Sequence, residues 1–106
     1  MPTGPKGYVI LTEAIKDPAG MAAYARAAQP AMAPGTVSIL AADRAPQSIE
    51  GRWHGDQTII LEFESVQAAR DWYHSDEYQA AAKLRHAAAD CNAVIVAGFE
   101  PPTGSG

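Results

Sequence analysis

The chain has 106 residues, of which 47% are hydrophobic and 19% are charged, and its formal net charge is −4 at pH 7. This size and composition are typical of a globular domain with one hydrophobic core, and they exclude a wholly disordered chain. The negative charge, with no cluster of Lys or Arg, argues against nucleic acid as a partner, because a phosphate backbone would be repelled.

We expect a single domain over residues 1–106, with an ordered core at about residues 7–99. No apolar segment is long enough to span a bilayer, and the N-terminus lacks the apolar region of a signal peptide, so no membrane partner is expected. Cys91 is the single cysteine, which excludes an internal disulfide and indicates a reducing compartment. These features predict a cytoplasmic protein. Residues 101–106 are typical of a frayed tail.

The first half of the chain predicts a strand, a helix and a second strand. Residues 8–12 form a β-rich run that continues toward Ile15. Asp17 is placed to cap a helix with Pro18 at its first position, and the helix ends before the next proline. A second strand follows over residues 35–40. The polar stretch after it, which contains a proline and two glycines, predicts a loop or a loose hairpin.

The second half predicts a strand, an interrupted helix and a last strand. Residues 57–64 are the clearest strand of the chain, because apolar residues alternate along one of its faces. Ser65 is placed to cap a helix, and Ser75 interrupts this helix and caps its continuation to about Ala89. Residues 91–99 form the last strand.

This order of elements predicts an α+β, ferredoxin-like βαββαβ fold. Two right-handed βαβ-type units place four antiparallel strands in one sheet, with both helices on one face. The other face stays uncovered, although Ile10 and Ile60 point to the opposite side from their apolar neighbours. Because a soluble monomer would not leave such a face to water, we expect a homodimer in which two sheet faces pair into a barrel.

The segments that carry this pattern also resemble a known family. They are Tyr8-Val9-Ile10, Asp17-Pro18, Tyr24, Glu50-Gly51-Arg52-Trp53, Ile60-Leu61-Glu62-Phe63, Ala68-Ala69-Arg70-Asp71-Trp72-Tyr73, Ser75-Asp76-Glu77-Tyr78-Gln79 and Leu84-Arg85. Over about residues 7–99 the chain resembles the DUF1330 family, which is similar to the dimeric α+β barrel proteins. That superfamily includes cofactor-free monooxygenases, isomerases and stress-response proteins. The resemblance therefore implies a fold and a dimer, but no particular reaction.

One departure from the family stands out near the second strand. Members of the family usually carry a glycine pair and arginines around that strand. In residues 35–44 of this chain the only arginine is Arg44, which lies toward the following loop. If those arginines serve a ligand in relatives, this chain either binds its ligand differently or binds none.

Arg85 is the leading candidate for a binding residue. It shares one side of a mostly apolar helix with Tyr78, and a guanidinium presents a rigid fork to a carboxylate or an enolate. Two other interpretations stay open. Arg85 could form an internal ion pair with Glu62 or Glu64, or its aliphatic stem could lie over the edge of the core. Glu62 in turn is either a half-buried general base or a structural partner of Arg85.

The remaining candidates are aromatic or titratable. The predicted ligand-binding set is Arg85, Tyr78, Glu62, Tyr73, Trp53 and Arg52. The aromatic residues could line a pocket or serve the core and the dimer interface. Glu62 and His74 are the weak catalytic candidates. The three histidines and the cysteine lack the spacing of metal ligands, and there is no phosphate-binding loop, so neither a metal nor a cofactor is expected.

Two hypotheses about function follow. The first is a homodimer that binds a small anionic or aromatic molecule between its sheet and its helices, without catalysis of its own. The second is a cofactor-independent monooxygenase or isomerase that uses a tyrosine or Glu62 to abstract a proton. An open cavity beside an unpaired Arg85 would favour binding, whereas a closed pocket in which Glu62 satisfies Arg85 would favour a structural role.

Overall fold

The computed structural model describes residues 4–100, so the predicted tail at residues 101–106 lies outside the described part of the chain. The elements in chain order are β1 (Gly7–Ile15), α1 (Pro18–Ala28), a short 3-10 helix η1 (Gln29–Met32), β2 (Ser38–Asp43), β3 (Gln57–Phe63), α2 (Val66–His74), α3 (Asp76–Ala88) and β4 (Ala89–Ala97). The strands form one antiparallel sheet in the order β2-β3-β1-β4. The predicted ferredoxin-like α+β fold is confirmed.

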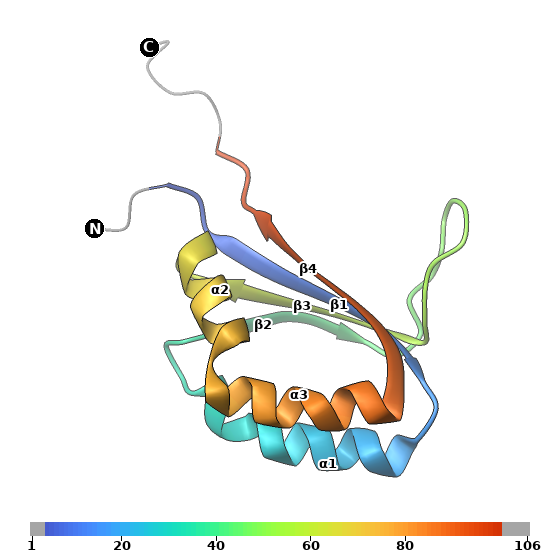
Figure 1. The fold of residues 1–106 in the computed structure, drawn as a ribbon. Helices are drawn as coiled ribbons and strands as arrows, with labels where there is room; N and C mark the ends of the chain where they lie inside the picture. The colour runs from blue at the N-terminus through green and yellow to red at the C-terminus, as the bar shows by residue number, and fades with distance from the viewer. Residues whose placement is uncertain (1–3, 101–106) are drawn as a thin grey trace.

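The helices all lie on one side of the sheet (Figure 1). α1 and α3 run side by side below the strands, and α2 lies near one end of the sheet. α1 packs mainly against α3 and makes few contacts with the strands. This arrangement leaves space between α1 and the β2–β3 half of the sheet, and the candidate site lies there.

Two of the three predicted helix caps are confirmed. Ser65 Oγ accepts a hydrogen bond of 2.9 Å from the backbone N–H of Ala68, and Ser75 Oγ accepts one of 3.1 Å from that of Tyr78. Each serine thereby satisfies an amide that has no partner within its helix. The Asp17 side chain makes no such bond to α1, although Pro18 occupies the first helical position as predicted.

Strand pairing moves two of the predicted strand boundaries. β4 begins at Ala89, directly after α3, because the long strand β1 pairs with β4 along its whole length from Gly7 to Ile15. The predicted start at Cys91 is therefore two residues late, since the pairing begins at Ala89. β2 begins at Ser38, later than predicted, and its pairing with β3 shifts at a bulge between Ile39 and Ala41.

The face of the sheet toward the helices is apolar except at one end. Val9, Leu11, Leu61 and Phe63 point into the core, as the alternation of strand residues requires. Glu13 is the next residue of β1 after Val9 and Leu11 whose side chain points to this helix-facing side. It pairs with Gln57 of β3 and with Cys91 of β4. A polar row of Gln57, Glu13 and Cys91 therefore crosses the helix-facing side of the sheet at this end.

The opposite face, which we call the open face, is covered by no helix (Figure 1). Its central row runs across all four strands through Ala41, Ile60, Ile10 and Val94. Val94 is 50% exposed, and Val96 one row along is exposed as well. The sequence-based expectation of an apolar open face is confirmed for these residues.

Gly55 provides a test of how the β2–β3 loop is attached to Glu13. Its φ is +85°, and an added Cβ would lie 2.6 Å from the backbone carbon and oxygen of Glu13. Gly51 also has a positive φ, of +68°, but no atom lies within 4 Å of an added Cβ. We expect Gly55→Ala to lower the free energy of unfolding by about 3 kcal/mol, and Gly51→Ala by only about 1 kcal/mol, in urea titrations. Equal losses would show that the close approach to Glu13 is not needed.

Candidate functional site

Arg85 lies in the core between the sheet and the helices, with 1% of its surface exposed. It belongs to the buried face of α3, which also carries Tyr78. The Cζ atom of Arg85 lies 5.8 Å from the centre of the Tyr24 ring of α1, and the hydroxyl oxygens of Tyr24 and Tyr78 are 2.7 Å apart. Trp72 stacks on Tyr78 with ring centres 4.0 Å apart. The guanidinium therefore lies among aromatic rings.

Two nitrogen atoms of Arg85, Nε and Nη2, are buried without a hydrogen-bond partner among residues 4–100. Burial by itself lowers the pKa of Arg85, but Tyr78, Cys91 and Tyr24 raise it, and the net pKa lies above its ordinary value. The guanidinium therefore stays charged at physiological pH. A buried charged donor without an acceptor is unfavourable, and an anionic ligand would relieve that cost.

Glu13 is the second charged group in this core, and its side chain is fully buried. Its Oε1 atom accepts a hydrogen bond of 2.7 Å from Nε2 of Gln57, whereas its Oε2 atom has no partner in the described part of the chain. Glu13 and Arg85, both within that part, form no direct ion pair. The same core thus holds an unsatisfied acceptor and an unsatisfied pair of donors.

Two open clefts lie next to each other between α1 and the sheet. The first, of about 570 Å³, lies between α1, η1 and the strands, and its wall includes Tyr24, Met32, Ile39, Ile59, Leu61 and Trp72. The second, of about 520 Å³, shares Tyr24, Ala25 and Ile59 with the first and continues past Gln57 to Arg44. Tyr24 contacts Arg85, and Gln57 is bonded to Glu13. Each buried charge therefore lies directly behind a residue of the cleft wall.

The predicted partnership of Glu62 with Arg85 is wrong. Glu62 points to the open face, where its Oε2 accepts a hydrogen bond of 3.0 Å from the Tyr8 hydroxyl. This hydrogen bond is the main cause that raises the pKa of Tyr8. Leu61 and Phe63, on either side of Glu62, are buried on the helix-facing side. Alternation along β3 therefore places Glu62 and Arg85 on opposite sides of the sheet.

Two other predicted residues, Tyr73 and His74, lie at the end of α2. The Tyr73 ring is 5.7 Å from that of Tyr78, so it touches the aromatic group around Arg85 from outside the clefts. His74 packs edge-on against Tyr73, and both line a shallow cleft of about 290 Å³ beside β4. His74 is thus not part of the Arg85 site.

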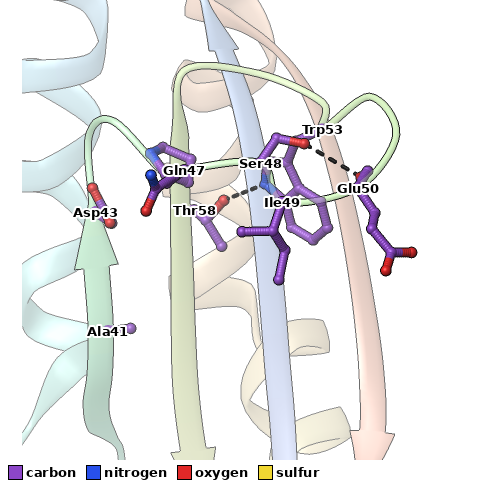
Figure 2. A pocket seen from close by; sticks show the side chains of 9 residues that line it. Ala41, Asp43, Gln47, Ser48, Ile49, Glu50, Trp53 and Thr58 are labelled. Carbon is purple, nitrogen blue, oxygen red and sulfur yellow. Dashed lines mark hydrogen bonds between the residues drawn. The ribbon is translucent and has the colours of Figure 1, made fainter.

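Trp53 and Arg52 lie in the loop between β2 and β3, and Trp53 lies on the side of the open face. The Trp53 Nε1–H donates a hydrogen bond of 2.7 Å to Thr58 Oγ1 (Figure 2). Trp53 also lines a cleft of about 480 Å³, together with Ala41, Asp43 and Ile49. Arg52 is exposed. Neither residue joins Arg85, so the six predicted ligand residues form no single site.

A further polar group lies at the same end of the open face. His54 Nδ1 is 2.7 Å from Thr12 Oγ1, and His54 Nε2 is 3.3 Å from Asp90 Oδ2. The Asp90 side chain is largely exposed, which makes this a surface contact that stabilises the loop. Among residues 4–100, no three His, Cys, Asp or Glu side chains gather in a way that could hold a metal ion.

Sequence reasoning missed Glu13, Tyr24 and Gln57 as site residues. A signal for Glu13 was present, because it occupies the same phase of β1 as Val9 and Leu11 and therefore the core face. Tyr24 appears in the sequence analysis only among the segments that resemble the family. The pairing of Gln57 with Glu13 depends on strand register, which no local pattern reveals.

A comparison with models of known protein families shows which family the chain belongs to. The model of DUF1330, a domain of unknown function, matches residues 6–99. The chain belongs to the DUF1330 family. No curated protein matches this sequence. The sequence-based resemblance is confirmed, and it covers every strand and helix described above.

Solved structures share the fold of this DUF1330 protein at low identity. A protein of unknown function from Rhodopseudomonas palustris has 20% identity and a TM-score of 0.73, over 93% of this chain and 86% of its own. A dimeric ferredoxin-like protein of unknown function from Thermobifida fusca has 17% identity and a TM-score of 0.60, over 90% and 92%. SnoaB, a cofactor-independent oxygenase from Streptomyces nogalater, has 14% identity and a TM-score of 0.59, over 96% and 100%. At these identities the similarity establishes the fold alone.

Members of the family usually carry arginines around the second strand. Arg44, the one present in this DUF1330 chain, follows β2 and lines the second cleft. Arg26 of α1 lines the first cleft. Both clefts therefore carry a cation in their walls, in a chain whose net charge is −4.

A thermodynamic cycle tests whether the two buried charges balance each other. We expect Arg85→Met and Glu13→Gln each to lower the free energy of unfolding by about 3 kcal/mol, because each leaves one buried charge uncompensated. The double variant should lose less than the sum, by at least about 1 kcal/mol, since it removes both charges. Urea titrations measure all four proteins. Strictly additive losses would show that Glu13 and Arg85 do not interact in the core.

Proposed function

We propose that this protein is a homodimer that binds a small anionic or aromatic molecule in the clefts between α1 and the sheet, with Arg85 as the anchor for the anion. The observation that carries this proposal is the buried guanidinium, whose Nε and Nη2 lack partners among residues 4–100. It lies behind Tyr24, which lines both clefts. Buried charges that serve only stability are normally paired and hydrogen-bonded.

The walls of the clefts support the same ligand chemistry. Ile59, Leu61 and Trp72 provide apolar and aromatic surface, and Arg26 and Arg44 add positive charge near the openings. Concave sites with mostly apolar walls and a few convergent polar groups are typical of small-molecule binding. The surface arginines would attract an anion before Arg85 holds it.

The second part of the proposal is that two copies pair through their open faces. The row of Ala41, Ile60, Ile10 and Val94 forms an apolar band across the sheet, and no element of residues 4–100 covers it. Apolar faces of this kind are characteristic of interfaces. Two structural relatives are described as dimeric. The cleft beside Trp53 adjoins this face and would border the interface.

The alternative, a cofactor-independent monooxygenase or isomerase, needs a base beside the substrate. Burial and the neighbouring Tyr78 raise the pKa of Tyr24 well above its ordinary value, so this tyrosine stays protonated at neutral pH. Glu62 lies on the open face and His74 in a separate cleft. These positions favour binding over proton abstraction by the predicted bases.

We also propose that the protein works in the cytoplasm. Cys91 is a free thiol, which suits a reducing compartment. Within residues 4–100, no helix is both long and apolar enough to cross a membrane.

Removal of the guanidinium tests the anchor. We expect benzoate to bind the purified protein saturably in calorimetric titrations, and Arg85→Met to weaken this binding at least about 30-fold, because the charged hydrogen bonds are lost. The matched control is Arg70→Met, which removes an exposed arginine of α2. Circular dichroism checks that each variant is folded. Equal affinity in the wild type and a folded Arg85→Met variant would contradict the proposal.

A charge on the open face tests the dimer. We expect Val94→Asp to raise the dimer dissociation constant at least about tenfold, because the carboxylate would be desolvated in the interface. Leu84→Asp is the control, since Leu84 on α3 has a similar exposure of 40% but lies on the helical side. Sedimentation velocity at micromolar concentration measures the change. A monomeric wild type under these conditions would rule out pairing through the open face.

A further inference from the structure

The two unpartnered nitrogen atoms of Arg85 define which groups it can hold. Nη2 is the terminal nitrogen on the same edge of the guanidinium as the Nε–H bond, so Nε and Nη2 present two parallel donors. Both are buried without partners within residues 4–100. Two parallel N–H groups match the two oxygens of a carboxylate, whereas a single oxygen acceptor would satisfy one of them. The free edge of Arg85 therefore selects a carboxylate over a lone carbonyl or hydroxyl.

Glu13 requires a hydrogen-bond donor on the ligand, whereas Arg85 requires an acceptor. Its Oε1 is occupied by Gln57, and its Oε2 is buried and has no donor within the described residues. A carboxylate ligand cannot satisfy this oxygen, because both groups would be acceptors. Only an O–H or N–H group on the ligand can pair with it.

The two anchors belong to one site. Glu13 lies opposite Cys91 in the β1–β4 pairing and is hydrogen-bonded to Gln57, while the Arg85 guanidinium lies 5.8 Å from the centre of the Tyr24 ring. Tyr24 lines both clefts, and Gln57, which holds Glu13, lines the second. The wall of the second cleft therefore includes one residue that contacts Arg85 and one that is hydrogen-bonded to Glu13.

We propose that the ligand is a carboxylic acid that also carries a hydroxyl group on an apolar, preferably aromatic, frame. Its carboxylate lies side-on against Nε and Nη2 of Arg85, and its hydroxyl donates a hydrogen bond to Oε2 of Glu13. The apolar frame rests against Ile59 and the ring of Tyr24. This inference rests on the proposed function, and it adds Glu13 as a specificity-determining residue for the hydroxyl group.

A matched series of probes tests this inference: benzoate, the three hydroxybenzoate isomers and phenol, each titrated calorimetrically into the full-length protein. We expect at least one hydroxybenzoate to bind about tenfold more tightly than benzoate, because its hydroxyl makes a hydrogen bond to a charged acceptor. Phenol, which has no carboxylate, should bind about 30-fold more weakly than that isomer. Arg85→Lys should weaken all the carboxylates about tenfold, because an ammonium group keeps the charge but loses the parallel donors.

The variant Glu13→Gln separates this inference from the proposed function. It should remove the advantage of the hydroxybenzoate over benzoate, whereas the control Glu64→Gln, an exposed carboxylate, should leave the advantage intact. If benzoate binds in an Arg85-dependent way but no isomer surpasses it on the wild-type protein, the hydroxyl requirement is overturned and the proposed function stands. If no carboxylate binds the wild type, both fail. The comparison of hydroxybenzoates with benzoate on the wild-type protein decides whether the ligand needs a hydroxyl group, even if Glu13→Gln does not fold.

Discussion

The burial of a charged guanidinium in the small core is the constraint on which the rest of this structure depends. Arg85 lies among the rings of Tyr24 and Tyr78, and its side-on edge has no acceptor within residues 4–100. The hydrogen bond between the two tyrosines joins α1 to α3 at this point. α1 packs mainly on α3 and makes few contacts with the strands, and two clefts lie between α1 and the β2–β3 half of the sheet. Tyr24, which contacts the buried charge, also lines both clefts.

The two faces of one sheet carry separate roles because strand residues alternate. On β1, the helix-facing series of Val9 and Leu11 ends in Glu13, while Ile10 belongs to the open face. The helix-facing series provides first the core and then the polar end of the candidate site. The open-face series provides the apolar band that we assign to the dimer. A shift of one residue in register would exchange these roles and bury the wrong carboxylate.

Membership of the DUF1330 family and likeness to ferredoxin-like structures establish the framework but not the ligand. Function depends on local chemistry at a few positions. In this chain the arginines that line the clefts are Arg26 on α1 and Arg44 after β2. The buried acceptor is Glu13, which has its own partner in Gln57. These residues, more than the fold, are the basis on which we propose a binding site.

The sequence by itself determined the elements that depend on near neighbours: the helix starts at Ser65 and Ser75, the alternation of β3, the fold and the family. The helix starts and the alternation follow from caps and periodicity, which act over a few residues. The fold follows from the order of the elements, and the family from the resemblance of whole sequence segments. Only the tertiary structure decided which glutamate shares the core with Arg85. Alternation places Glu13 in phase with Val9 and Leu11, but it does not say which side of the sheet the helices cover or which carboxylate lies near Arg85. Strand pairing and helix packing, which join residues far apart in the chain, placed Glu13 inside and Glu62 outside.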